Sequence, residues 1–132
     1  MVGGMTITHV QFLTLPVADH ARARDFYVGK LGFEALVDRR TPEGGHFVMV
    51  APKGAKTAVV LTDQQVTGIG GGPRHFQLQT TDLDADVAAL RAAGVEVAEP
   101  EKRPWGRATS FKDLDGHTLG LLEPSDFGNV PG

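Results

Sequence analysis

The chain has 132 residues, a length that fits one compact domain or two very small modules sharing a core. Its formal net charge is −3, and its 13 lysines and arginines are scattered rather than gathered into a basic stripe, so we expect no nucleic-acid partner. The chain contains no cysteine, which excludes a disulfide framework, a thiolate nucleophile and a cysteine-rich zinc site.

The first half of the chain predicts a strand, a helix and three further strands. The N-terminus MVGGMTITHV lacks a basic stretch followed by an apolar core, and no apolar run of about 18 residues occurs, so we expect neither a signal peptide nor a membrane span and assign a cytoplasmic location by default. Hydrophobic periodicity then predicts a strand over 6–17, a helix over 18–30, and strands over 33–40, 46–51 and 56–63.

The same order recurs after a glycine-rich segment, TGIGGGP, at residues 67–73. This segment lacks the Lys-Ser/Thr pair of a phosphate loop, so we interpret it as a linker. The second half predicts a strand over 74–80, a helix over 82–93, and strands over 95–99, 105–113 and 117–123.

Helix caps align the two halves. Asp19 and Asp82 stand at the helix starts, where an aspartate accepts hydrogen bonds from free amides, and Gly32 and Gly94 close the same helices. An internal repeat of this kind predicts an α+β fold made of two βαβββ modules. The modules cover residues 5–66 and 74–124, and 125–132 form a C-terminal tail.

Two such modules would each carry a helix on one face of a small sheet, and joining their free faces would form an open, barrel-like cup. The interior of the cup is then the expected ligand site. In the strand RHFQLQT, Phe76 and Leu78 should pack under the helix, so His75, Gln77 and Gln79 should face the cup. The strand HTLGLLE is ambiguous. Placing Glu123 in the cup brings His117, Leu119 and Leu121 there with it.

Three motifs carry a family resemblance: PVADHARARDFYVGKLGFE, HFQLQTTDLDADVAALRAAGVEV and FKDLDGHTLGLLEP. With them the chain resembles the vicinal oxygen chelate superfamily, which contains glyoxalase I, extradiol dioxygenases, and fosfomycin and bleomycin resistance proteins. The resemblance implies a single glyoxalase-like domain over residues 1–132, and a homodimer. It is not specific for any one activity.

In metal-using relatives, four cup positions hold a divalent ion. The resemblance carries these positions onto Phe12, Val60, His75 and Glu123, of which only His75 and Glu123 could ligate a metal. One histidine and one carboxylate fall short of the roughly three protein ligands of a catalytic zinc. His9, through a bulged first strand, or His46 could supply a further imidazole.

Other side chains are candidates for ligand contact. Trp105 and Arg107 are separated by one residue of a predicted strand and should face the same way, and an aromatic ring beside a cation suits a planar or anionic ligand. His75 and Glu123 are the candidate catalytic residues. The expected ligand-binding residues are Phe12, Thr14, Val60, Gln77, Trp105, Arg107 and Leu121.

Three functional hypotheses remain open. The first is a metal-independent protein that binds a small organic molecule in its cup, as bleomycin resistance proteins do. The second is a lyase, isomerase or dioxygenase of glyoxalase type, with a divalent metal on His75, Glu123 and a third donor. The third is an enzyme in which His75 and Glu123 form a metal-free acid-base pair.

Overall fold

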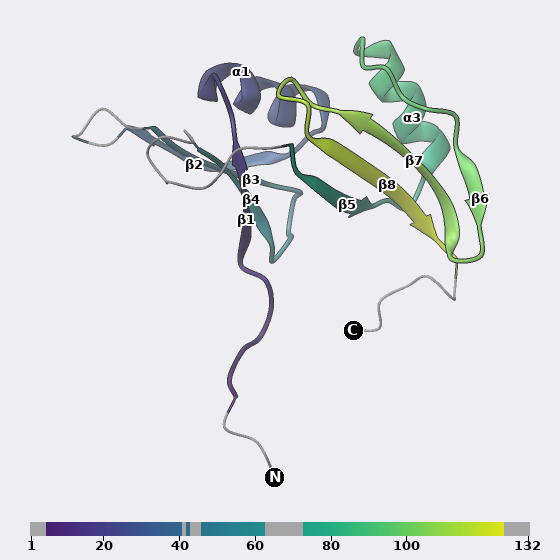
Figure 1. The fold of residues 1–132 in the computed structure, drawn as a ribbon, viewed down its shortest axis with the longest axis horizontal. Helices are drawn as coiled ribbons and strands as arrows, with labels where there is room; N and C mark the ends of the chain where they lie inside the picture. Colours follow the sequence, from purple (N-terminus) through teal and green to yellow (C-terminus); the bar gives the residue numbers. More distant parts are fainter. Residues whose placement is uncertain (1–4, 41, 43–45, 63–72, 126–132) are drawn as a thin grey trace. The chain divides into compact units, whose positions relative to one another are not determined.

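The computed structural model describes residues 5–40, 42, 46–62 and 73–125. The chain divides into two compact units, residues 1–70 and 71–132, and each contains a four-stranded sheet with helical structure (Figure 1). The fold is therefore α+β, as predicted. The expected linker and tail lie outside the described residues except for Pro73 and Ser125. Within the described part, no helix is both long and apolar enough to cross a membrane.

The first unit repeats the predicted order of elements. It contains β1 (Phe12–Pro16), α1 (His20–Asp25), a π-helical turn (Phe26–Lys30), β2 (Glu34–Arg40), β3 (His46–Ala51) and β4 (Ala58–Thr62). The strand order is β1-β4-β3-β2, with β1 and β4 parallel and the other pairs antiparallel. We call this the first sheet.

One face of the first sheet forms the core of its unit. Leu15, Val48 and Leu61 are almost completely buried on this face. Tyr27, from the π-helical turn that continues α1, is also fully buried, with its ring centroid 5.6 Å from that of Phe33. Among the described residues of this unit, no helix covers the opposite face, which we call the open face of the first sheet.

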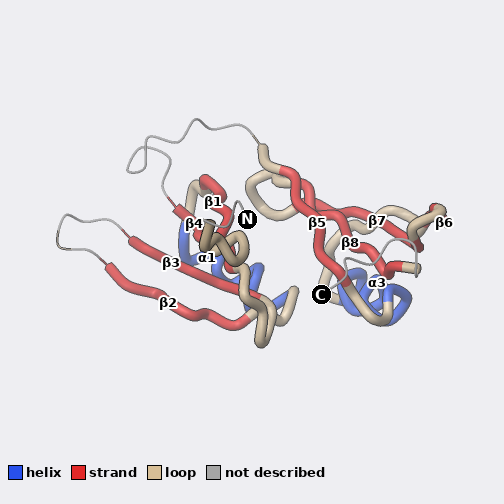
Figure 2. The backbone as a smooth tube through the Cα atoms, turned by 90° about the horizontal axis from the view of Figure 1, so that it is seen from below, coloured by secondary structure: helices blue, strands red, loops and turns tan. Residues whose placement is uncertain are grey.

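The second unit follows the same plan with one correction to the prediction. It contains β5 (His75–Gln79), α3 (Leu83–Ala92), β6 (Glu101–Arg103), β7 (Gly106–Lys112) and β8 (Thr118–Pro124), in the sheet order β5-β8-β7-β6 (Figure 2). The strand predicted over 95–99 is wrong, because Val97 makes only an isolated bridge to Phe111. Pro100 has no N–H to donate to a ladder, and the paired strand forms after it.

Both helices begin as the sequence predicts. Asp19 Oδ1 accepts from the amide of Arg22 at 3.1 Å, and Asp82 Oδ1 accepts from the amide of Ala85 at 3.1 Å. Each helical segment ends in a glycine with positive φ, 76° at Gly32 and 86° at Gly94, where a side chain would be strained.

Helix α3 packs against one face of the second sheet. Leu83, Val87 and Leu90 are its buried residues. On β8, Leu119 is 0% and Leu121 is 6% exposed, so the odd-numbered side chains of this strand lie on the helix side. The even-numbered ones project from the other face, which we call the open face of the second sheet.

This assignment of faces predicts unequal costs for two leucine truncations in β8. Leu119→Ala should lower the free energy of unfolding by about 2–5 kcal/mol, because it leaves a cavity under α3. Leu122→Ala, on the open face, should cost less than half as much. Urea denaturation followed by circular dichroism measures both, and equal losses would contradict the assignment.

Candidate functional site

The open face of the second sheet carries polar side chains from β5. Residues paired across a ladder project to the same side of a sheet. The pairs of β5 and β8 on this face are His75 with Thr118, Gln77 with Gly120, and Gln79 with Leu122. His75 and Gln77 therefore lie together on the face away from α3. Phe76 pairs with Leu119 on the helix side.

The centre of this open face is a floor of small residues. Ser110 of β7 lies opposite Gly120, and Ala108 lies opposite Leu122. A row therefore runs from Gln77 over Gly120 to Ser110 across three strands. Ala108, Ser110 and Gly120 were not predicted as site residues. The signal for Ala108 and Ser110 was the alternation of small with larger residues in GRATSFK, and that for Gly120 was a lone glycine in the strand TLGLLEP.

The open face of the first sheet is mainly apolar. Thr14 pairs with Val60, Val60 with Met49, and Met49 with Val37, so these four side chains share a face. Phe12 projects to the same side from the start of β1 and is 41% exposed. The structure thus brings together Phe12, Thr14 and Val60, all of which were expected to contact a ligand.

Strand register revises one of the four positions at which relatives hold a metal. Thr14 pairs with Val60 in the first sheet, and the corresponding pair in the second is Gln77 with Gly120. The first strands are offset by 63 residues but the last strands by 60, because the modules differ in length between the helix and the last strand. Gly120, rather than Glu123, is the structural counterpart of Val60.

These residues do not fit a metal site. Phe12, Val60 and Gly120 have no donor side chain, and His75 alone of the four retains one. No group of three or more His, Cys, Asp or Glu side chains that could hold an ion occurs among the described residues. A site with one imidazole lacks the three protein ligands that a catalytic zinc requires.

Glu123 lies on the helix side of the second sheet, not on the open face as expected. Its Oε1 accepts from the amide of Leu83, the first residue of α3, at 2.9 Å. That amide is one of the donors that a helix leaves free at its N-terminus, and a carboxylate also suits the positive end of the helix dipole. His75 and Glu123 thus project from opposite faces of one sheet, and the acid-base pair does not form.

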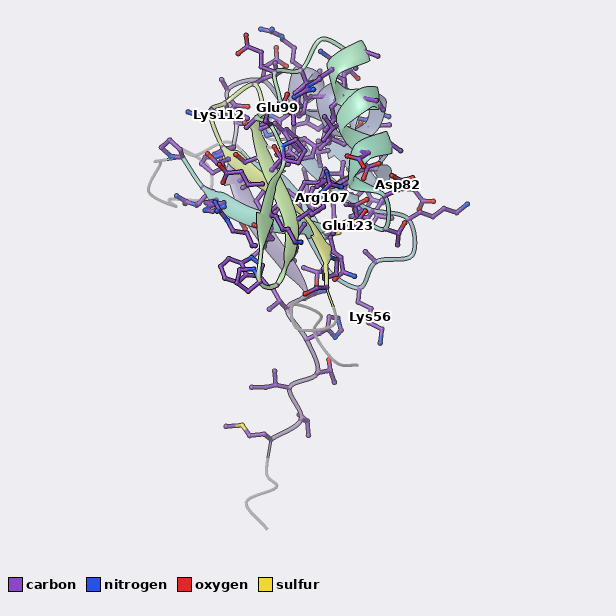
Figure 3. The ribbon with its side chains drawn as sticks, turned by 90° about the vertical axis from the view of Figure 1, so that its right-hand side faces the viewer. Lys56, Asp82, Glu99, Arg107, Lys112 and Glu123 are labelled. Carbon is purple, nitrogen blue, oxygen red and sulfur yellow. The ribbon has the colours of Figure 1, made fainter. Side chains whose placement is uncertain are left out.

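Arg107 and Leu121 also lie on the helix side. The Arg107 guanidinium donates two hydrogen bonds to the Asp84 carboxylate of α3, at 3.1 and 3.0 Å. These hydrogen bonds, and secondarily the charge of Arg107, lower the pKa of Asp84. Figure 3 shows Arg107 and Glu123 close to Asp82, at the start of α3. Arg107 and Leu121 therefore lie on the side of the sheet that carries α3, and they do not face the open side.

Trp105 lies in the turn between β6 and β7, not on a strand as predicted. Its carbonyl accepts from the amide of Ser125 at 2.9 Å, and the Ser125 hydroxyl donates to the carbonyl of Pro104 at 3.0 Å. The expectation that Trp105 and Arg107 face the same way depended on a regular strand. Because Trp105 lies in a turn, strand alternation does not place it on the same side as Arg107. The Trp105 side chain is 46% exposed.

The two other candidate metal donors do not lie on the open face of the first sheet. His46 is on the helix side, where its Nε2 is hydrogen-bonded to Asp38 and its ring centroid is 5.1 Å from that of His20. The hydrogen bond from His46 is the largest cause of the lowered pKa of Asp38. His9 precedes β1, with its Nδ1 2.8 Å from the Thr8 hydroxyl.

Comparison with known proteins adds a family and named relatives. Residues 6–121 match the family model described as the Glyoxalase/Bleomycin resistance protein/Dioxygenase superfamily. The crystal structure of TnmS3, an antibiotic binding protein from Streptomyces sp. CB03234, is 45% identical with a TM-score of 0.83, covering 92% of this chain and 99% of that one. A glyoxalase/bleomycin resistance protein from the same organism is 40% identical, with a TM-score of 0.76 over 87% of this chain and all of that one.

A putative lactoylglutathione lyase from Brassica oleracea var. gemmifera is 31% identical over 116 residues. The match covers 81% of this chain and 41% of the relative.

Removal of the Glu123 carboxylate should destabilise the second unit. Glu123→Ala leaves the Leu83 amide without this acceptor, and the loss should be about 1–2 kcal/mol in the free energy of unfolding. Glu123→Gln keeps an acceptor oxygen and should lose less. Urea denaturation of both variants tests the capping role, which equal stability of Glu123→Ala and the wild type would contradict.

The ion pair of Asp84 and Arg107 predicts an acid-dependent contribution to stability. A folded pKa below the unfolded value of about 3.9 means that the contribution is complete above about pH 4 and is lost as the pH falls through the folded pKa. Arg107→Met should therefore raise the pKa of Asp84 in an NMR titration and weaken the pH dependence of stability below about pH 4.

Arg103→Met is the matched control, since Arg103 pairs with Glu101 rather than with Asp84. An Asp84 pKa that moves equally in both variants would contradict the assigned cause.

Proposed function

Since the chain belongs to the glyoxalase/bleomycin resistance protein/dioxygenase superfamily, we propose that it binds a small organic molecule without a complete metal site. One observation carries this proposal: of the four structural positions at which metal-using relatives hold an ion, only His75 has a donor side chain. The similarity to TnmS3, an antibiotic binding protein, supports an antibiotic as the class of ligand.

Each open face, taken by itself, offers contacts to an organic molecule. On the first sheet, Phe12 exposes apolar surface on the same face as the Thr14 hydroxyl, while Val60, the ladder partner of Thr14, is 4% exposed. Gln77 and His75 present hydrogen-bonding groups on the second sheet. Glu123, Arg107 and Leu121 are not part of this proposal, because they serve the core and the helix start.

A second candidate is a divalent-metal-dependent lyase, favoured by the similarity to the putative lactoylglutathione lyase. For this chain, His75 would be one ligand, and the remaining donors would have to come from residues other than Phe12, Val60 and Gly120. The donor set therefore disfavours this candidate. A homodimer and a cytoplasmic location remain predictions from the sequence.

Thermal denaturation in the presence of a chelator tests the proposal. Chelator-treated protein is heated with each member of a panel of antibiotics that includes metal-free bleomycin and aromatic polyketides. A compound at 100 times its dissociation constant should stabilise the protein by about 2.7 kcal/mol, a rise of several degrees in Tm. We expect at least one compound to produce this rise with the chelator present.

Two results would contradict the proposal. One is a panel in which no compound changes the Tm. The other is stabilisation that appears only after zinc, nickel or manganese is added, together with uptake of about one metal equivalent per chain in elemental analysis. That second result would favour the lyase.

A further inference from the structure

The carboxamide of Gln77 has a defined place on the open face of the second sheet. Gln77 and Gly120 are ladder partners on neighbouring strands. A Cβ built on Gly120 would overlap this carboxamide, with Oε1 the nearest atom, Cδ at 2.6 Å and Nε2 at 2.9 Å. The side chain therefore crosses from β5 to lie over Gly120, in space that only a glycine leaves open.

Within the part of the chain that the structure describes, no side-chain hydrogen bond engages the Gln77 carboxamide, and the residue is exposed. Many other polar side chains of this unit are engaged, among them Asp84, Arg107 and Glu123. A carboxamide offers one acceptor and two donors, and one N–H is parallel to the C=O. Gln77 thus presents a donor and an acceptor side by side to whatever approaches this face.

We propose that Gln77, whose carboxamide lies over Gly120, selects ligands that carry a cis-amide edge, as in a lactam, an imide or a primary amide. Such an edge also presents an N–H and a C=O side by side, so it can form two parallel hydrogen bonds with the Gln77 carboxamide. The trans amide of an ordinary peptide bond points its N–H and C=O in opposite directions, and it forms only one. This inference rests on the proposed function and names the chemical class of its ligand.

The floor beside the carboxamide suits a flat ring. Beyond Gly120 in the same row lies Ser110, and Ala108 follows on β7 on the same face. These side chains are short, and Leu122, opposite Ala108, borders them on one side, so a planar lactam paired with Gln77 can lie flat over Gly120 and Ser110. The Ser110 hydroxyl is a further hydrogen-bonding group at this place.

A pair of probes that differ by one donor tests the inference. 2-Quinolinone is a planar lactam, and 1-methyl-2-quinolinone has the same ring and carbonyl but no N–H. Each is titrated into the isotope-labelled full-length protein and followed by NMR. We expect 2-quinolinone to shift the Gln77 side-chain amide signals and the Gly120 and Ser110 backbone signals. It should bind about two- to tenfold more tightly than the methylated probe, the range that one net hydrogen bond provides.

Substitutions on the same strand locate the discrimination. Gln77→Leu should abolish the difference in affinity between the two probes. Gln79→Leu is the matched control, because Gln79 lies on the same strand and face but opposite Leu122, and it should retain the difference. Gly120→Ala keeps the Gln77 carboxamide but fills the space over residue 120 that the carboxamide occupies. It should therefore reduce the difference in affinity between the two probes. If Gly120→Ala does not fold, the comparison of the two glutamine variants on the exposed surface still decides the test.

The outcomes separate this inference from the proposed function. Equal affinity of the two probes, or a difference that persists in Gln77→Leu, overturns the role of Gln77. Failure of both probes to bind also overturns it. In each case the proposed function stands if an antibiotic still stabilises the chelator-treated protein. If no antibiotic does so, the proposed function falls on its own test.

Discussion

Leu119 and Leu121 pack beneath α3, and this burial sets the direction of every other side chain in β8. A strand turns successive side chains to opposite faces, so two buried leucines at alternate positions leave Gly120 and Leu122 on the open face. The ladders then transmit the same constraint to β5 and β7, where Gln77 and Ser110 face the same way as Gly120. The residues on the open face are therefore those that alternate with the residues buried against α3.

Four charged residues of the second unit, Asp82, Asp84, Arg107 and Glu123, lie where α3 begins. Asp82 accepts from the amide of Ala85, and Glu123 accepts from that of Leu83, so two carboxylates meet amides that the helix leaves free. Arg107 holds Asp84 in the first turn of the helix. A carboxylate at the end of an otherwise apolar strand thus has a structural explanation. It secures a helix start from 40 residues away in the sequence.

The residues that stand in place of metal donors also shape the open face of each sheet. Where a metal-using relative would place a donor, this chain has a phenylalanine, a valine and a glycine. The phenylalanine adds exposed apolar surface to the first sheet, and the valine is buried within it. The glycine opens space on the second, and the Gln77 carboxamide occupies it.

Local patterns in the sequence were sufficient to predict the repeat, the helix caps at Asp19 and Asp82, and the alternation of β5. Each of these features depends on neighbours within a few residues. Three features were not local. Pro100 displaced the expected strand, the turn at Trp105 removed its pairing with Arg107, and the choice of face for Glu123 depended on α3. In β8, leucines occur on both faces of the strand, Leu119 and Leu121 on one and Leu122 on the other, so periodicity did not decide which face packs against the helix. The sequence by itself determined the fold and the place of His75 and Gln77, whereas only packing against the helix decided that Gly120, and not Glu123, lies on the open face of the second sheet.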